Sequence, residues 1–249
     1  MLQLGKITCI IAVVSLFAFS NIAIADERVE LVYAPGPAAN PLKGLVPYSN
    51  DTNMHFPHSM EFGYVGLADL MLGYDEFDWQ PMERLLNPIA GRSHQAVFRV
   101  YLEYPNKTNG IPIFLLKDGL KVHRYLNTNT QPFPPANVET PDYEDKNLRR
   151  ALVNFIAALG KKYDGDPRIG FVTAGLLGTW GEWHTYPRGE LFASKTVQAE
   201  VMDVYAAAFQ VTPVLRFSIP SKATDSSLHL RFKTEALRRF ITIGRGLTA

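Results

Sequence analysis

Cysteine is nearly missing from this chain: of its 249 residues, Cys9 is the only one. Cys9 lies in an amino-terminal apolar run that we expect to be removed on export, which would leave the mature chain without a thiol. This excludes disulfide bonds, thiolate metal ligands and a cysteine nucleophile from the mature protein. An exported chain without cross-links must be stabilised by burial alone, which favours a large domain over a small one.

Excess charge of one sign is also missing. Lys and Arg number 25, Asp and Glu number 24, and the formal net charge is +1. No cluster of Lys and Arg stands out, so we expect no nucleic-acid partner. Hydrophobic residues make up 47% of the chain and charged residues 20%, a balance typical of a globular domain rather than a disordered chain.

Several motifs are missing as well, and each absence excludes a class of chemistry. There is no Gly-x-Ser-x-Gly, no phosphate-binding P-loop and no Gly-x-Gly-x-x-Gly, so neither an esterase-type serine nor a nucleotide cofactor is expected. The histidines at 55, 58, 94 and 123 show no ligand spacing such as His-x-x-x-His. We therefore predict neither a metal nor a cofactor.

The first 25 residues form a segment of a different kind. Lys6 gives a short positive start, residues 7–19 are almost wholly apolar, and Ala23-Ile24-Ala25 supplies the small-x-small pattern of a signal peptidase site. This arrangement predicts a signal peptide and a secreted or periplasmic mature protein with no membrane association after cleavage. The alternative is a retained membrane anchor, for which the apolar run is short.

Beyond residue 25 the pattern changes twice. Residues 26–60 are rich in Pro, Gly and Asn and predict a loop-rich lead-in. From residue 61, apolar runs typical of buried strands alternate with segments of helical period, which predicts βα units on a parallel sheet. Strands are expected at 61–67, 96–103, 111–116, 168–175 and 211–217, and helices after Asp78, after Thr140 and from Ser194.

These units predict an α/β fold over residues 61–217, an incomplete (β/α)8 barrel of the TIM type with about five βα units. A closed barrel usually takes about 250 residues, and the strand pattern fails after residue 217. Residues 218–249 are therefore expected to be a divergent tail, with at most one short helix around 234–241.

Glu182, in Trp180-Gly181-Glu182-Trp183-His184, is the strongest catalytic candidate. It follows the strand expected at 168–175, and loops at the carboxyl ends of strands form the active sites of such barrels. A carboxyl beside large apolar rings has a raised pKa, which a general acid for glycosidic bonds requires. Trp180, Trp183 and Tyr186 are candidates for stacking on a sugar ring. The alternative is a Trp-rich loop that closes one end of the barrel, with Glu182 in a salt bridge.

The strand expected at 96–103 adds three candidates for substrate binding, because its alternation places Arg99, Tyr101 and Glu103 on one face. An inward Arg99 would be buried and would need a carboxylate partner. It either orients a catalytic carboxylate or forms a structural ion pair with Glu61 or Glu103. His184 either binds a substrate hydroxyl or is merely solvated in its loop.

Together these motifs resemble the clan of retaining glycoside hydrolases that share a (β/α)8 barrel, and most of all a poorly characterised group of secreted bacterial barrel proteins. The resemblance covers residues from about 40 to 217. Its most specific pieces are Tyr163-Asp164-Gly165-Asp166-Pro167-Arg168-Ile169 and Gly178-Thr179-Trp180-Gly181-Glu182-Trp183. Weaker pieces are Asn40-Pro41-Leu42-Lys43-Gly44, residues 74–86, Phe98-Arg99-Val100 and Pro141-Asp142-Tyr143.

The resemblance implies that Glu182 is the general acid/base after strand four, that Arg99 on strand two supports the nucleophile, and that the partner is carbohydrate. Two departures stand out. Gly181 occupies the place where the clan usually has Asn, and the clan's nucleophile, a Glu at the end of strand seven, has no counterpart, a role we do not assign to Glu235. The leading hypothesis is a glycoside hydrolase-like barrel acting on a poly- or oligosaccharide. The alternatives are a non-catalytic carbohydrate-binding protein and an inactive truncated barrel.

Overall fold

The computed structural model describes residues 41–51, 53, 55–107, 110–130, 133–218 and 240–244, all within one compact unit, Pro37–Ala249. The expected signal peptide, the first part of the lead-in and most of the helix expected around 234–241 lie outside these residues. Within the described part of the chain, no helix is long and apolar enough to cross a membrane.

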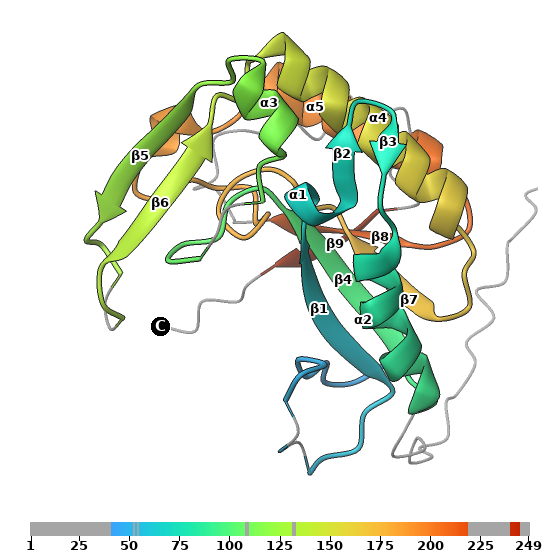
Figure 1. Ribbon diagram of the computed structural model, residues 1–249. Helices are drawn as coiled ribbons and strands as arrows, with labels where there is room; N and C mark the ends of the chain where they lie inside the picture. The colour runs from blue at the N-terminus through green and yellow to red at the C-terminus, as the bar shows by residue number, and fades with distance from the viewer. Residues whose placement is uncertain are drawn as a thin grey trace, which may run out of the picture. The chain divides into compact units, whose positions relative to one another are not determined.

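A parallel sheet of five strands forms the centre of this unit (Figure 1). In spatial order the strands are β1 (Met60–Gly66), β4 (Gln95–Tyr101), β7 (Ile169–Thr173), β8 (Val214–Ser218) and β9 (Phe240–Gly244). Every neighbouring pair is parallel. Parallel neighbours require crossover connections, and helices lie in the connections from β1 to β4, from β4 to β7 and from β7 to β8. The predicted fold class, an α/β partial (β/α)8 barrel, is confirmed.

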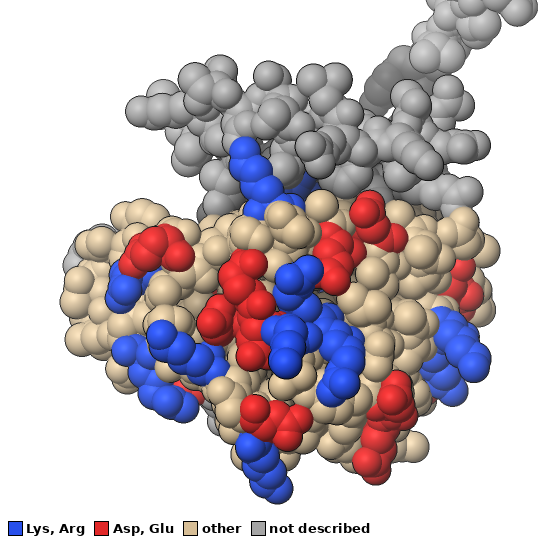
Figure 2. Space-filling view, turned by 90° about the horizontal axis from the view of Figure 1, so that it is seen from above, with Lys and Arg blue, Asp and Glu red and all other residues tan. Residues whose placement is uncertain are grey.

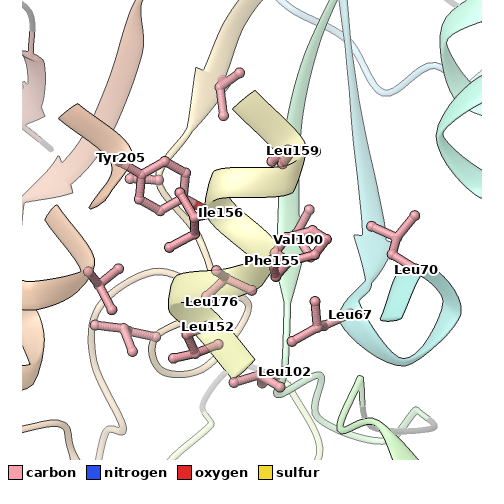
Figure 3. Close-up of a cluster of buried hydrophobic side chains, with 14 of the residues drawn as sticks. Leu67, Leu70, Val100, Leu102, Leu152, Phe155, Ile156, Leu159, Leu176 and Tyr205 are labelled. Atoms are coloured by element: carbon pink, nitrogen blue, oxygen red, sulfur yellow. The ribbon is translucent and has the colours of Figure 1, made fainter. Parts of the chain in front are cut away.

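Three long helices cover one face of the sheet. They are α2 (Gln80–Gly91), α4 (Lys146–Tyr163) and α5 (Lys195–Ala208). The apolar stripe predicted for the second of these is confirmed, because Leu148, Leu152, Phe155, Ile156 and Leu159 are all fully buried. Figure 3 shows several of these side chains packed with Val100, Leu102 and Leu176. The core therefore lies between the sheet and the helices.

Helix α4 begins later than the sequence suggested. Thr140 and Pro141 end strand β6, and the cap is Asp145, whose side chain accepts hydrogen bonds from the backbone N–H groups of Asn147 and Leu148. At α5 the expected start is confirmed, because the Ser194 side chain accepts from the N–H of Val197. A side-chain acceptor at this position satisfies an N–H that the helix leaves unpaired.

Shorter elements are inserted between the carboxyl ends of the strands and the helices that follow. After β1 come α1 (Leu67–Leu70), β2 (Met71–Gly73) and β3 (Glu76–Phe77). Between β4 and α4 lie α3 (Ile113–Lys117) and the antiparallel pair β5 (Val122–Asn127) and β6 (Ala136–Pro141). The 3-10 helix η1 (Gly189–Leu191) precedes α5. These insertions extend the edge of the sheet at which barrel enzymes carry their sites.

The strand predicted at 111–116 is wrong. Pro112 caps the short helix α3 there, and β7 pairs directly with β4. Ile113 is 62% exposed while Leu115 is buried, although a strand would place these two residues on the same face. A short apolar run does not distinguish a buried strand from a buried helical turn.

Pairing extends beyond the predicted strands on both sides of the sheet. In the expected lead-in, Tyr48 forms a parallel bridge with Phe62, on the edge of β1 that faces away from β4. Beyond residue 217, Phe240 and Ile241 belong to β9 rather than to a short helix. In the order of the sheet Arg99 lies on the second strand, β4, while Glu182 follows the third strand, β7, rather than the fourth, because residues 111–116 form no strand.

Charged side chains of both signs are mixed on the surface of this unit. Figure 2 shows Lys and Arg interspersed with Asp and Glu across one face. Partly exposed ion pairs join helices and loops, among them Arg149 with Glu200 at 2.7 Å and Arg168 with Glu83 at 2.7 Å. Such exposed pairs contribute little stability individually, about 0–1 kcal/mol.

Candidate functional site

The loop that follows β7 carries Glu182 and is attached to the end of β4. Leu176 N–H donates to the Val100 carbonyl at 2.8 Å, and Trp180 N–H donates to the Glu103 carbonyl at 3.0 Å. Thr179 and Glu103 form a parallel bridge. The loop therefore continues the β4–β7 pairing beyond the strands, which brings Glu182 to the face of β4 that carries Arg99.

The backbone of this loop adopts left-handed conformations at residues that disfavour them. Trp180 has φ 54° and Trp183 has φ 60°, while Gly178 and Gly181 have φ 77° and 68°. Positive φ at a bulky residue is a true outlier, and such strain concentrates at functional sites. At Gly181 an added Cβ would lie 3.0 Å from Gly175 Cα and 3.1 Å from Arg99 Cδ. This crowding and the positive φ together account for the glycine at position 181.

Gly178 gives a test of the loop's conformation. A Cβ there would lie 2.6 Å from the backbone nitrogen of His184 and even closer to its carbonyl oxygen. We expect Gly178→Ala to lower the free energy of unfolding by about 2–3 kcal/mol, because it adds a backbone clash to an unfavourable φ. The matched control is Gly189→Ala, where an added Cβ meets nothing within 4 Å. Chemical denaturation of both variants checks this, and equal effects would contradict it.

Glu182 forms an ion pair with Arg99, whose Nη1 donates to Oε1 at 3.0 Å. Both side chains are largely buried, with 7% of Arg99 and 16% of Glu182 exposed. The same Nη1 donates to the Tyr64 hydroxyl at 3.2 Å, and the guanidinium carbon lies 5.6 Å from the centre of the Tyr64 ring. Of the two alternatives for Arg99, the geometry favours the one in which it orients a carboxylate in the site.

The two carboxylates considered as structural partners of Arg99 are engaged elsewhere. Glu61 accepts hydrogen bonds from Arg92 and His94 near the amino-terminal end of β1. Glu103 is fully buried and accepts from the hydroxyls of Tyr143 at 2.5 Å and Thr140 at 2.9 Å. Glu103 is therefore a support of the site rather than a substrate contact, which corrects the sequence-based prediction.

His184 is the second neighbour of the Glu182 carboxylate. Its Nδ1 accepts the backbone N–H of Tyr186 at 3.3 Å, so in the neutral ring the proton lies on Nε2. That Nε2 is 3.7 Å from Glu182 Oε2. His184 is therefore held in the site rather than merely solvated.

The pKa of Glu182 is lowered, whereas its sequence context predicted a raised pKa. Burial raises it, but the neighbouring His184 and the charge of Arg99 outweigh burial, and the pKa lies below the ordinary value of 4.5. The indoles flank Glu182 in sequence, whereas a cation contacts it in space. Glu182 is consequently an ionised carboxylate at neutral pH.

The two tryptophans have different roles. Trp183 is only 7% exposed, and its indole N–H donates to the Ala174 carbonyl at 2.7 Å, so it belongs to the core. Its proposed role as a sugar platform is therefore wrong. Trp180 is partly exposed and lies edge-on to Tyr104 and His184, with ring centroids 6.5 and 6.4 Å away. Tyr186 is 61% exposed beside the loop.

Further aromatic rings continue from Trp180 across the same face of the sheet. We call this set the aromatic row: Tyr48, Phe62, Tyr64, Tyr101, Tyr104 and Trp180. Neighbouring rings in it are 4.8–6.5 Å apart. Sequence reasoning found Tyr101 and Trp180 but missed the others. The alternation of Phe62 and Tyr64 along β1 was the available signal, since both face the same side as Arg99.

One other group in the described residues has the composition of a metal site. His58, Glu61 and His94 lie together near the amino-terminal ends of β1 and β4, whereas Glu182 lies beyond the carboxyl end of β7. None of the residues predicted for the sugar site belongs to it.

Comparison with known proteins finds distant structural likenesses only. No family model matches the chain, and no curated protein matches it. Endo-glycoceramidase II from Rhodococcus sp. in a five-membered iminocyclitol complex is similar at a TM-score of 0.43 and 12% identity, over 64% of this chain and 40% of that one. The same enzyme with ganglioside GM3 gives 0.42 and 12%, over 64% and 41%. A GH5_18 variant from Bifidobacterium longum subsp. longum, bound to Manb1-4GlcNAc, gives 0.39 and 11%, over 63% and 34%.

The chain thus spans about two fifths of the endo-glycoceramidase chains and a third of the GH5_18 chain. At this distance the likeness carries nothing about activity, substrate or individual residues. The fold class follows from the pairing of the strands themselves, and function has to follow from the geometry around Glu182.

Proposed function

We propose that this protein carries a carbohydrate site of the glycoside hydrolase type, with Glu182 as the carboxylate that acts on the glycosidic bond. The observation that carries the proposal is the buried Arg99–Glu182 ion pair beyond the carboxyl end of a parallel sheet, next to the partly exposed Trp180. Active sites of parallel barrels occupy this edge. Export of the chain, which we also propose, would give the site access to extracellular polysaccharide.

The aromatic row supports carbohydrate as the ligand. Tyr48 is 53% exposed and Trp180 partly so, while the rings between them line the face that bears Arg99. Binding sites are mostly apolar surfaces with a few polar groups that fix orientation. Aromatic faces can stack on the C–H face of a pyranose, and Glu182, Arg99 and His184 can orient its hydroxyls.

Cleavage places a further demand on the site. Retaining enzymes hold two carboxyl groups about 5–5.5 Å apart, one as nucleophile and one as acid/base. A second carboxylate at that distance would raise the pKa of Glu182 toward that of a proton donor. Within the described residues Glu182 contacts Arg99 and His184 instead, and its pKa is lowered. We infer that hydrolysis requires a second carboxylate that the described residues do not place beside Glu182.

The lowered pKa of Glu182 favours a second candidate function, carbohydrate binding without cleavage. A carboxylate that arginine helps to keep ionised at neutral pH accepts hydrogen bonds from sugar hydroxyls but donates no proton. The binding function needs only the residues around Trp180 and Glu182.

The Glu182→Gln variant tests both candidates. The purified protein is assayed for binding and for hydrolysis of β-linked oligosaccharides, with Glu190→Gln, an exposed glutamate six residues beyond the loop motif, as the matched control. For a hydrolase we expect Glu182→Gln to retain binding and to lose about 10²–10⁴-fold of turnover, the usual contribution of an acid/base group. Saturable binding without turnover identifies the binding function. The absence of both, or a turnover that Glu182→Gln leaves unchanged, overturns the proposal.

A further inference from the structure

Two histidines lie side by side at the amino-terminal end of the sheet, away from the proposed sugar site. His58 precedes β1 by two residues, and His94 immediately precedes β4. These strands pair in parallel with Met60 opposite Gln95, and the Gln95 N–H donates to the Ser59 carbonyl at 3.0 Å. The backbone ladder therefore fixes the two imidazoles as neighbours. Their ring centroids are 4.6 Å apart, at an interplanar angle of 54°.

The hydrogen bonds of these rings define which nitrogen carries the proton. His58 Nδ1 is 2.8 Å from the Phe56 carbonyl oxygen, which can only accept, so Nδ1 donates. His94 Nδ1 is 2.7 Å from Glu61 Oε1. Arg92 also donates to both oxygens of Glu61, so the carboxylate is an acceptor and His94 Nδ1 donates to it. In the neutral rings both Nε2 atoms therefore present a lone pair, and among the described residues neither has a hydrogen-bond partner.

We propose that His58 and His94 bind a divalent transition-metal ion, zinc or copper, through their Nε2 atoms. Metal-bound histidine almost always donates its other ring N–H to a carboxylate or a backbone carbonyl, which fixes the ring and raises its basicity. Here one histidine donates to a carbonyl and the other to a carboxylate. One ligand atom from each of His58, Glu61 and His94 lies within 4.8 Å of the others. Imidazole is a ligand that suits both ions.

Arg92 determines how Glu61 takes part. Its Nε and Nη2 donate to the two oxygens of Glu61 at 2.8 and 2.5 Å. The carboxylate is therefore held as the acceptor for His94 and is not a direct ligand. With two protein ligands and water in the remaining positions, the site is open, and 22% of the His94 side chain is exposed. An open site of this kind binds metal more weakly than a closed site with four protein ligands.

The spacing of the histidines in the sequence could not reveal this site. A motif such as His-x-x-x-H is recognisable because one helix presents both ligands. His58 and His94 instead come from the residues before two strands whose neighbourhood only the fold establishes.

The test is a calorimetric titration of the metal-free protein with ZnCl2 and, separately, CuCl2. We expect one ion per chain, and at least tenfold weaker binding for His58→Ala and for His94→Ala. His123→Ala is the matched control, because His123 lies in β5 and pairs with Thr140. Binding that is absent, or that both variants leave at the wild-type level, overturns the proposal.

Arg92→Gln supplies a second test, in which metal binding is expected to become tighter rather than weaker. Removing the guanidinium releases a Glu61 oxygen to become a third ligand, so binding is expected to tighten about tenfold, the scale on which outer-shell groups change metal affinity. Electron paramagnetic resonance of the copper-loaded protein should show two equatorial nitrogens in the wild type and one in His58→Ala. A spectrum without histidine nitrogens contradicts the site. Neither readout depends on carbohydrate, so the outcome is independent of the proposed function.

Discussion

Arg99→Met is expected to lower the free energy of unfolding by about 3–5 kcal/mol at neutral pH, the usual consequence of removing one partner of a buried ion pair. Only 16% of the Glu182 side chain is exposed, so its charge would stay buried without the guanidinium that compensates it. Adding Glu182→Gln to Arg99→Met removes that charge, so the double variant should be more stable than Arg99→Met alone.

The stability that Arg99→Met loses relative to the wild type should depend on pH and be smaller at acidic pH. The folded-state pKa of Glu182 lies below its ordinary 4.5, so its ionisation stabilises the fold above that pH, and the contribution is lost as the pH falls through the lowered pKa. The difference between wild type and Arg99→Met should therefore be full at neutral pH and shrink as the pH falls through the acidic range, because protonation of Glu182 removes the charge that Arg99 compensates. Urea denaturation across this range measures it. As a control, Arg149→Met removes a partly exposed pair and should change stability by no more than about 1 kcal/mol. Equal losses in the two variants would refute the role given to Arg99.

Glu103→Gln is expected to abolish a pH dependence of stability between pH 4.5 and 7. Burial raises the pKa of Glu103 to about 7, against the lowering effect of hydrogen bonds from Tyr143, Thr140 and Thr179. The folded state therefore holds a proton that the unfolded chain releases at its ordinary 4.5, and the stability of the wild type falls as the pH rises through this interval. At roughly 1.4 kcal/mol per pH unit the loss amounts to roughly 3 kcal/mol.

The control for Glu103 is Glu76→Gln, which alters an exposed carboxyl on β3. It should leave the slope of stability against pH as in the wild type, whereas Glu103→Gln should flatten it. The Tyr143 hydroxyl that donates to Glu103 also accepts the Gly178 N–H at 2.7 Å, so ionisation of Glu103 is linked to the loop that carries Glu182. An unchanged slope in Glu103→Gln would show that this carboxyl does not titrate in that interval.

The spacing of apolar residues predicted the packing of helices on the sheet, because buried positions there recur with the period of a helix or a strand. The stripe from Leu148 to Leu159 recurs with helical spacing, and it packs against strand positions such as Phe98 and Val100 that alternate with Arg99. In both cases the side facing the core is set by geometry within one element. The orientation of Arg99 away from the helices could be predicted for the same reason.

Predictions from the sequence pattern were wrong where the surroundings of a residue are formed by distant parts of the chain. Trp183 resembles Trp180 in sequence and shares its positive φ, but the Trp183 indole donates to the Ala174 carbonyl and lies in the core. The bridge between Tyr48 and Phe62 joins a short segment without strand periodicity to the edge of the sheet. Neither arrangement leaves a signal within a window of a few residues.

The prediction of a raised pKa for Glu182 was wrong for a related reason. Neighbouring indoles in the sequence predicted desolvation, and burial does raise the pKa. The hydrogen bond from His184 and the charge of Arg99, which reaches Glu182 from a different strand, together outweigh burial. The sequence showed both residues as candidates without showing that they meet.

Carbon-13 NMR of the glutamate carboxyl groups, with Glu182 assigned through Glu182→Gln, tests whether an ionised Glu182 contacts sugar. We expect the Glu182 signal to titrate below the ordinary 4.5 and to shift when a β-linked oligosaccharide is added, while the signal of the distant Glu61 does not respond to the saccharide. A Glu182 signal that titrates at or above the ordinary value, and that no saccharide perturbs, would contradict it.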